Sequence, residues 1–253
     1  MSATWVTMLG IRMLKRILAV ADMVHPYIYR DTFPSGLEPL DLVLIAGDLP
    51  GYYIEFIATR CTCPVVFVYG NHGEEKVKDY LGQMVDPGGA INAHGKFIRA
   101  GDFRIIGWGG APRYNERNDG GQYTGAQVKM GLGRLEWGLW LEKRRKTTPF
   151  DIFLTHAPPP GPHAGTDHAH RGCKEIGEFL HRHKPALMVH GHVHAYEGKK
   201  VEYQTDFGSK IVNAYGYTVL ELELPNAQSS AGSSLKANPQ SGVFMLDTSV
   251  LAD

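Results

Sequence analysis

Five apolar runs of strand length, each ending in polar residues, constrain the fold of this 253-residue chain more than any other feature. Continuous apolar runs of this length are typical of β-strands that are covered on both faces. Helical segments separate several of them, which predicts a layered α/β domain with early strand–helix alternation. The five runs are RILAVAD (16–22), DLVLIAGD (41–48), PVVFVYGNH (64–72), DIFLTHAPPP (151–160) and ALMVHGHVH (186–194).

Turn chemistry and periodicity predict the remaining elements. KFIRAGDFRIIGWGG (96–110) is typical of a hairpin about Gly101 and Asp102. KIVNAYGYTVLELEL (210–224) predicts a strand, with GKKVEYQT (198–205) as a candidate partner. The predicted helices cover 53–59, 74–84, 132–146 and 173–183.

The predicted organisation is one domain over 13–225, preceded by an N-terminal extension over 1–12. Residues 226–253 begin with the Ser-, Ala- and Asn-rich stretch NAQSSAGSSLKANPQSG, which predicts a flexible low-complexity tail. No apolar stretch reaches the roughly 18 residues of a membrane span, and the N-terminus lacks the pattern of a signal peptide.

Charge content narrows the classes of partner, and cysteine content indicates the redox setting. Lys plus Arg equals Asp plus Glu, at 26 each, so no excess charge indicates a nucleic-acid polymer or a membrane surface as a partner. The three cysteines are Cys61, Cys63 and Cys173, an odd number whose spacing argues against a disulfide framework. We therefore expect a reduced, cytoplasmic setting. The sequence does not indicate an oligomeric state.

The polar residues at the strand ends are the candidate site. In open sheets, ligands bind beyond the carboxyl ends of the strands. Five strand ends there supply Asp, Asp, Asn-His, His and His-x-His, a set of carboxylate, amide and imidazole ligands without a thiolate. The sequence therefore predicts a metal site at this edge.

Each motif alone has an ordinary explanation. An isolated His-x-His is usually a surface pair, although residues i and i+2 of an extended segment do point the same way. Asp after Gly is common turn chemistry, and His72 could cap a following helix. Coincidence becomes implausible only because all the motifs occur in order at the ends of separate strands.

In this order the motifs resemble those of the calcineurin-like metallophosphoesterases, over about residues 13–225. That family pattern is Asp-x-His, Gly-Asp, Gly-Asn-His, a single His and Gly-His-x-His. The resemblance implies a four-layer αββα sandwich and two divalent metal ions. Mn²⁺ is expected first, with Fe²⁺ and Zn²⁺ as alternatives. The corresponding residues here are Asp22, Asp48, Asn71, His72, His156, His192 and His194.

The resemblance also implies a role for each residue. Asp48 would bridge both metals, and Asn71, His156 and His192 would complete one of them. Asp22 and His194 would hold the other. His72 would face the leaving group as a general acid or as a stabiliser of the transition state.

The implied function is hydrolysis of a phosphomonoester or phosphodiester, including nucleotides and cyclic nucleotides, through a metal-activated water. The substrate is then a small-molecule phosphoester. The alternative is a degenerate scaffold or sensor that binds metal or phosphate with little catalysis.

Two departures from the pattern concern the first motif and the acid after the third. Val24 stands where the family has histidine, which leaves the first metal one protein ligand short and more weakly bound. His25 or water is expected to fill the gap, although extended geometry points His25 away. Gly73 follows His72 where an acid is common, and Glu74 or Asp22 is expected to take over its role.

Two loops are candidates for substrate and supporting contacts. The Gly-rich loop 109–124 carries Arg113 and Asn115, of which an arginine suits a phosphate oxygen. The loop 161–173 adds further polar side chains that either line the pocket or steady metal ligands from outside: His163, Asp167, His168 and His170.

Overall fold

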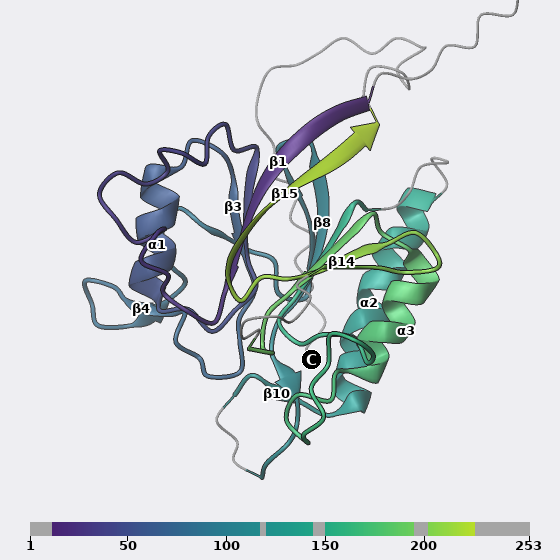
Figure 1. Ribbon diagram of the computed structural model, residues 1–253. Coiled ribbons are helices and arrows are strands. Elements are labelled where there is room, and N and C mark those ends of the chain that lie inside the picture. Colours follow the sequence, from purple (N-terminus) through teal and green to yellow (C-terminus); the bar gives the residue numbers. More distant parts are fainter. Residues whose placement is uncertain (1–11, 117–119, 144–149, 195–201, 226–253) are drawn as a thin grey trace, which may run out of the picture.

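The computed structural model describes residues 12–116, 120–143, 150–194 and 202–225, which form two large β-sheets between helices (Figure 1). The first sheet has the spatial order β15 (Gly216–Pro225), β1 (Arg12–Ala21), β2 (Leu42–Ile45), β3 (Val65–Phe67) and β6 (Ile91–Asn92). The second has the order β13 (Glu202–Gln204), β14 (Lys210–Asn213), β12 (Leu187–His190), β11 (Ile152–Thr155), β8 (Phe103–Trp108) and β7 (Lys96–Ala100).

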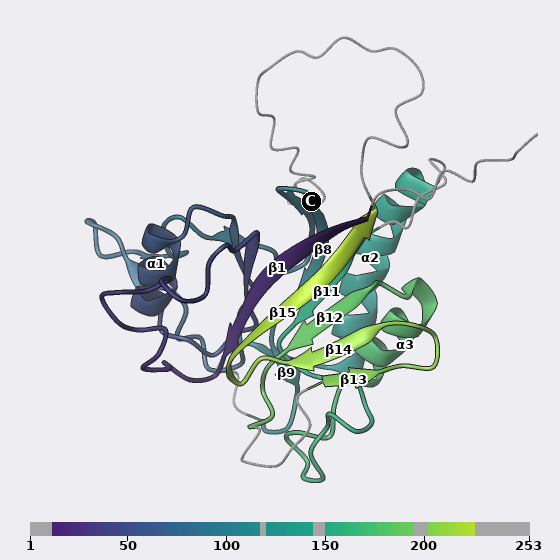
Figure 2. The same cartoon turned by 45° about the horizontal axis from the view of Figure 1, so that its top comes forward.

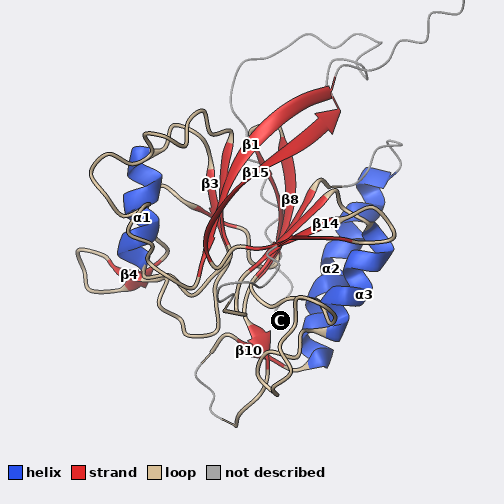
Figure 3. Ribbon diagram, viewed as in Figure 1, coloured by secondary structure: helices blue, strands red, loops and turns tan. Residues whose placement is uncertain are grey.

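Helix α1 (Gly51–Arg60) covers the outer face of the first sheet, and α2 (Gly125–Lys143) and α3 (Lys174–His183) cover that of the second (Figure 3). Two small sheets complete the structure. They pair β4 (Val77–Lys78) with β5 (Met84–Val85), and β9 (Ala111–Pro112) with β10 (Gln122–Tyr123).

Three clusters of buried side chains separate the four layers. Successive residues of a strand point to opposite faces, so Ile17 of β1 packs between the two sheets while Leu18 packs beneath α1. In the second sheet, Leu154 of β11 packs between the sheets and Phe153 packs against α2 and α3. The order helix, sheet, sheet, helix confirms the predicted αββα sandwich.

All five apolar runs form strands, and their directions agree. β1, β2 and β3 are parallel to one another, as are β8, β11, β12 and β14. The predicted hairpin over 96–110 is confirmed as the antiparallel pair β7–β8. Because parallel strands end at the same edge, the polar residues after the five runs are carried to one side of the molecule.

The run 210–224, predicted as one strand, is divided between the two sheets. Its first part is β14, which pairs with β13 as expected from the sequence (Figure 2). Its second part is β15, which pairs with β1 along its whole length. The chain passes from one sheet to the other at Ala214 and Tyr215, where backbone bonds to both sheets are made.

The helix predicted over 74–84 is wrong, because this segment forms the β4–β5 hairpin. Two acidic side chains take up backbone N–H groups and favour turns over a helix. The Asp79 carboxylate accepts hydrogen bonds from the Leu81 and Gln83 amides, and the fully buried Glu75 carboxylate turns inward.

The helix predicted over 132–146 begins earlier, at Gly125. Thr124 and Gln127 form a capping box, in which each side chain accepts a hydrogen bond from the backbone amide of the other. Gly131 within this helix is required by packing, since a Cβ there would lie 2.0 Å from the Trp108 ring.

Within the described residues, no helix combines the length and apolar character that crossing a bilayer requires. The tail predicted over 226–253, and all of the predicted N-terminal extension except Arg12, lie outside those residues.

The Arg104–Asp151 ion pair provides a test of the second sheet. Asp151 accepts hydrogen bonds from the Arg104 amide and from its guanidinium, and its side chain is 8% exposed. Asp151→Ala leaves a largely buried guanidinium unpaired, so we expect the free energy of unfolding to fall by about 3 kcal/mol in urea titrations. Glu178→Ala breaks an exposed pair with Lys174 and should cost less than about 0.5 kcal/mol. Equal losses in the two variants would contradict the assignment.

Candidate metal centre

The polar residues after five parallel strands meet where the carboxyl ends of the two sheets come together. Asp48, His156 and His192 each offer one ligand atom, and these atoms all lie within 4.8 Å of one another. They follow β2, β11 and β12, so the cluster joins both sheets. Segments far apart in the sequence are thus brought to one point by the sandwich.

The backbone at three predicted ligands is in the left-handed region, which non-glycine residues rarely adopt. The φ angles are +64° at Asp22, +53° at Asp48 and +68° at His192. The other such residue in the described part of the chain is Lys184, at the C-terminal cap of α3, where this conformation is usual. Each strained residue costs on the order of 1–3 kcal/mol, and such strain gathers at functional sites.

His156 is the centre of a convergent set of acceptors. Its Nε2 lies 2.8 Å from Asn71 Oδ1 and 3.2 Å from Asp48 Oδ2, and its Nδ1 donates to the Ala46 carbonyl at 2.7 Å. Asn71 Nδ2 donates to the Tyr114 hydroxyl at 3.1 Å, which fixes Oδ1 as the atom facing His156. A neutral His156 therefore points a lone pair at two further acceptors, and only a proton or a cation satisfies all three.

The electrostatics of the cluster show the same preference for a positive charge. Burial opposes the charged form of His156, but the Asp48 carboxylate outweighs it and raises the pKa to about 9. Burial likewise opposes ionisation of Asp48, yet His156 lowers its pKa to about 2. At Asp22 burial prevails over the opposing charge of His156 and raises the pKa to about 6. Buried carboxylates, an amide oxygen and imidazoles that together require a cation fit a divalent metal ion.

His192 is held as a neutral imidazole. Its Nε2 donates to the Ala169 carbonyl at 3.0 Å, so its Nδ1 keeps the free lone pair. Burial lowers its pKa to about 3, which favours the metal-binding form. Its backbone amide donates to both oxygens of Asp22, at 2.9 and 3.0 Å, and so ties the first strand end to the cluster.

The remaining predicted site residues border this cluster. His72 is exposed, its amide donates to Asp48 Oδ1 at 3.0 Å, and its Nε2 lies 3.7 Å from Asp48 Oδ2. His194 is also exposed, and its ring packs on Tyr215 at 4.8 Å between centroids. Neither His194 nor Asp22 belongs to the group within 4.8 Å.

Val24 and His25 both have partners away from the cluster. Val24 packs against the apolar cluster beneath α1. The His25 ring meets Tyr217 edge-on, with 4.6 Å between centroids, and its Nδ1 accepts the Tyr27 amide at 3.2 Å. His25 lies outside the group within 4.8 Å, so its role as a ligand stays a prediction.

Glu75 is a supporting residue that the sequence did not predict, and the expected role of Glu74 or Asp22 beside His72 stays a prediction. The Glu75 Oε1 accepts the amides of Asp48 at 2.7 Å and Gly70 at 2.5 Å, and the residue is fully buried. It thereby joins the turn that carries Asp48 to the turn that precedes Asn71. Its signal in the sequence was only an acid near the Gly-Asn-His motif.

Two motif glycines are required because ligand side chains occupy the space of a Cβ. A Cβ on Gly70 would lie 1.9 Å from Asp48 Oδ1, and one on Gly191 would lie 2.6 Å from Asp22 Oδ2. The glycines of the Gly-Asn and Gly-His dipeptides therefore leave room for these carboxylates as well as allowing the turns.

Both candidate loops reach the centre, partly through residues other than those predicted. The Gly-rich loop does so through Tyr114, whereas Arg113 is exposed and Asn115 is half-buried. The loop 161–173 supplies the Ala169 carbonyl, and the His170 ring lies 4.8 Å from that of His192. Other side chains of this loop make local contacts: Asp167 pairs with His170, and His163 contacts His190.

Residues 15–196 match the model of the calcineurin-like phosphoesterase family. The chain belongs to this family. No curated protein sequence matches it.

Two solved structures of low identity share the fold. TT1561 of Thermus thermophilus is 17% identical, with a TM-score of 0.51 over 84% of this chain and 99% of that protein. The second structure is 14% identical, with a TM-score of 0.54 over 83% of this chain and 95% of its own. A weaker match is vacuolar protein sorting 29 from Cryptosporidium parvum, which is 14% identical, with a TM-score of 0.37 over 83% of this chain and 86% of its own.

Metal binding should depend on pH, because a cation must displace the His156 proton. With its pKa raised to about 9, His156 is protonated at neutral pH in the metal-free protein. We expect the apparent affinity for Mn²⁺, measured by titration calorimetry, to rise about tenfold per pH unit as the pH approaches 9. An affinity for Mn²⁺ that stays constant over this pH range would show that the cation does not displace a proton from His156.

Removal of the Glu75 carboxylate should destabilise the site. Glu75→Ala leaves the buried Asp48 and Gly70 amides without an acceptor, so we expect a loss of about 3 kcal/mol in the free energy of unfolding. Glu75→Gln keeps an acceptor oxygen and should lose about 1 kcal/mol or less. The matched control is the exposed neighbour, as Glu74→Ala. A Glu75→Ala variant as stable as this control would refute the bracing role.

Proposed function

We propose that this protein is a metal-dependent phosphohydrolase that cleaves a phosphomonoester or phosphodiester. The observation that carries the proposal is the convergence of Asn71, Asp48 and His156 acceptor atoms, which leaves a cation as their common partner. Membership of the calcineurin-like phosphoesterases supports the general class of reaction.

The proposal assigns one divalent ion to Asp48, Asn71, His156 and His192, and a second to Asp48, Asp22 and His194. When bound, two such ions neutralise phosphoryl oxygens and lower the pKa of a water molecule. The Ala46 and Ala169 carbonyls orient the two buried imidazoles, and Tyr114 orients the amide. The proposed ligand side chains are therefore already oriented before an ion binds. Such preorganisation on a rigid scaffold favours catalysis.

His72 is assigned the proton transfer to the leaving oxygen. It lies at the exposed side of the cluster, where a substrate would approach, and its side chain is 62% exposed. Its amide bond to Asp48 fixes the backbone, while the imidazole stays open to solvent. An alkoxide leaves poorly, and an imidazole that holds a proton at this edge lowers that barrier.

On the substrate side, the Gly-rich loop is assigned contact with the phosphate. The exposed Arg113 supplies a guanidinium that suits two phosphoryl oxygens, and Asn115 lies two residues further on. Nucleotides and cyclic nucleotides are the first substrates to screen. Mn²⁺ is the first ion to supply, and we expect the ion held by Asp22 and His194 to bind more weakly because Val24 offers no ligand.

The test is hydrolysis of an aryl phosphodiester with added Mn²⁺. Asn71→Ala and His192→Ala each remove a ligand, and we expect kcat/KM to fall at least about 100-fold. His181→Ala alters an exposed histidine of α3 that contacts Phe207 and is not part of the cluster, and it serves as the control. Wild-type turnover in Asn71→Ala would contradict the metal assignment, whereas tight metal binding by a wild-type protein without turnover would favour the scaffold alternative.

A further inference from the structure

A pair of cysteines lies at the opposite end of the first sheet from the metal centre. Cys61 follows α1, where its amide caps the helix by donating to the Ile57 carbonyl. The chain then bends at Thr62 and Cys63 before β3 begins at Val65. The pair therefore precedes the amino end of β3, whereas the metal ligands follow the carboxyl ends of the strands.

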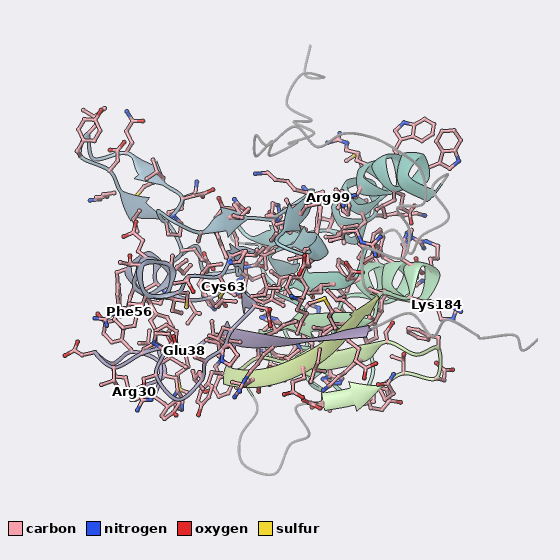
Figure 4. The ribbon with its side chains drawn as sticks, turned by 90° about the horizontal axis from the view of Figure 1, so that it is seen from above. Arg30, Glu38, Phe56, Cys63, Arg99 and Lys184 are labelled. Carbon is pink, nitrogen blue, oxygen red and sulfur yellow. The ribbon has the colours of Figure 1, made fainter. Side chains whose placement is uncertain are left out.

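Both cysteines line one surface cavity of about 180 Å³, together with Glu38 and Leu40. Both residues are half-buried. Figure 4 shows Glu38 and Cys63 on the side of the molecule that carries α1. A cavity of this size accepts the sulfur-bearing end of a small molecule.

The two thiols act on each other directly. Cys61 and Cys63 are two residues apart on a segment that bends at Thr62 and Cys63, and both line the same cavity. Interaction with Cys63 raises the pKa of Cys61, and the same interaction lowers the pKa of Cys63. A lowered pKa favours the thiolate form, so Cys63 is the thiol assigned the first attack.

A metal site does not explain the pair. In the described part of the chain, the one group of three or more metal-ligating side chains within reach of each other is Asp48, His156 and His192. Glu38 lines the cavity but does not complete a third ligand with the two thiols. Two adjacent thiols with one activated are the requirement of thiol–disulfide exchange.

We propose that Cys61 and Cys63 form a redox site that a low-molecular-weight disulfide, such as glutathione disulfide, closes reversibly into an intramolecular disulfide. The Cys63 thiolate attacks one sulfur of the oxidant, forms a mixed disulfide and releases one glutathione thiolate. Cys61 then gives up its proton and attacks the Cys63 sulfur, which forms the new S–S bond and releases the second glutathione. The protein is oxidised by two electrons and one glutathione disulfide is reduced to two glutathione molecules, which take up the two cysteine protons.

Cys173 provides an internal control for this chemistry. It is the third and last cysteine of the chain, it is buried, and burial raises its pKa to about 12. It should stay a free thiol under conditions in which the other two react.

The test is mass spectrometry of the intact, folded full-length protein and of its peptides after incubation with glutathione disulfide. We expect the protein to lose the mass of two hydrogen atoms, with Cys61 joined to Cys63, and to regain it with dithiothreitol. A persistent glutathione adduct as the end product, or no reaction at either residue, would overturn the proposal.

Two single variants then test the order of attack. Cys61→Ser removes the resolving thiol, so glutathione should remain attached to Cys63. Cys63→Ser removes the attacking thiolate, and the adduct at Cys61 should form at least about tenfold more slowly. Faster reaction at Cys61 than at Cys63 would overturn the assigned roles. Neither variant touches the metal centre, so phosphoesterase activity should stay unchanged in both.

Discussion

The convergence of acceptor atoms on His156 determines what the candidate metal centre can hold. An imidazole lone pair, an amide oxygen and a carboxylate oxygen cannot satisfy one another, so the site is stable only with a positive charge among them. In the metal-free protein that charge is a proton, held by a pKa raised to about 9. The proposed function follows from replacing the proton by a divalent ion.

The fold supplies the means to hold this arrangement. The parallel strands of the two mixed sheets place their carboxyl ends together, and three clusters of buried side chains hold the layers in position. The strained backbone at Asp22, Asp48 and His192 is stabilised by this surrounding structure. Glu75 and the motif glycines then set the close approach of the turns. The strained backbone at the strand ends lowers the stability of the fold, and the buried apolar clusters offset this loss.

The sequence predicted those features of the fold and of the candidate site that depend on strong local patterns. Continuous apolar runs predicted the strands, and the ordered motifs after them predicted Asp48, His156 and His192, which the fold brings together. The helix over 74–84 was predicted wrongly because the helical composition of that segment is overridden by Glu75, whose carboxylate is used inside the site. The Ala169 carbonyl was missed, and the contact of Tyr114 with Asn71 was not predicted, for a related reason. Their roles come from loops whose paths are set by tertiary contacts, which local spacing does not encode.

The most direct test of the central claim is the number of metal ions bound per chain. Protein purified without chelator and reloaded with Mn²⁺ would be measured by elemental analysis, beside an Asp48→Asn variant. We expect two ions per wild-type chain and loss of both in the variant, because Asp48 is proposed to bridge them. A wild-type protein that binds no ion, or a variant that still binds two, would contradict it.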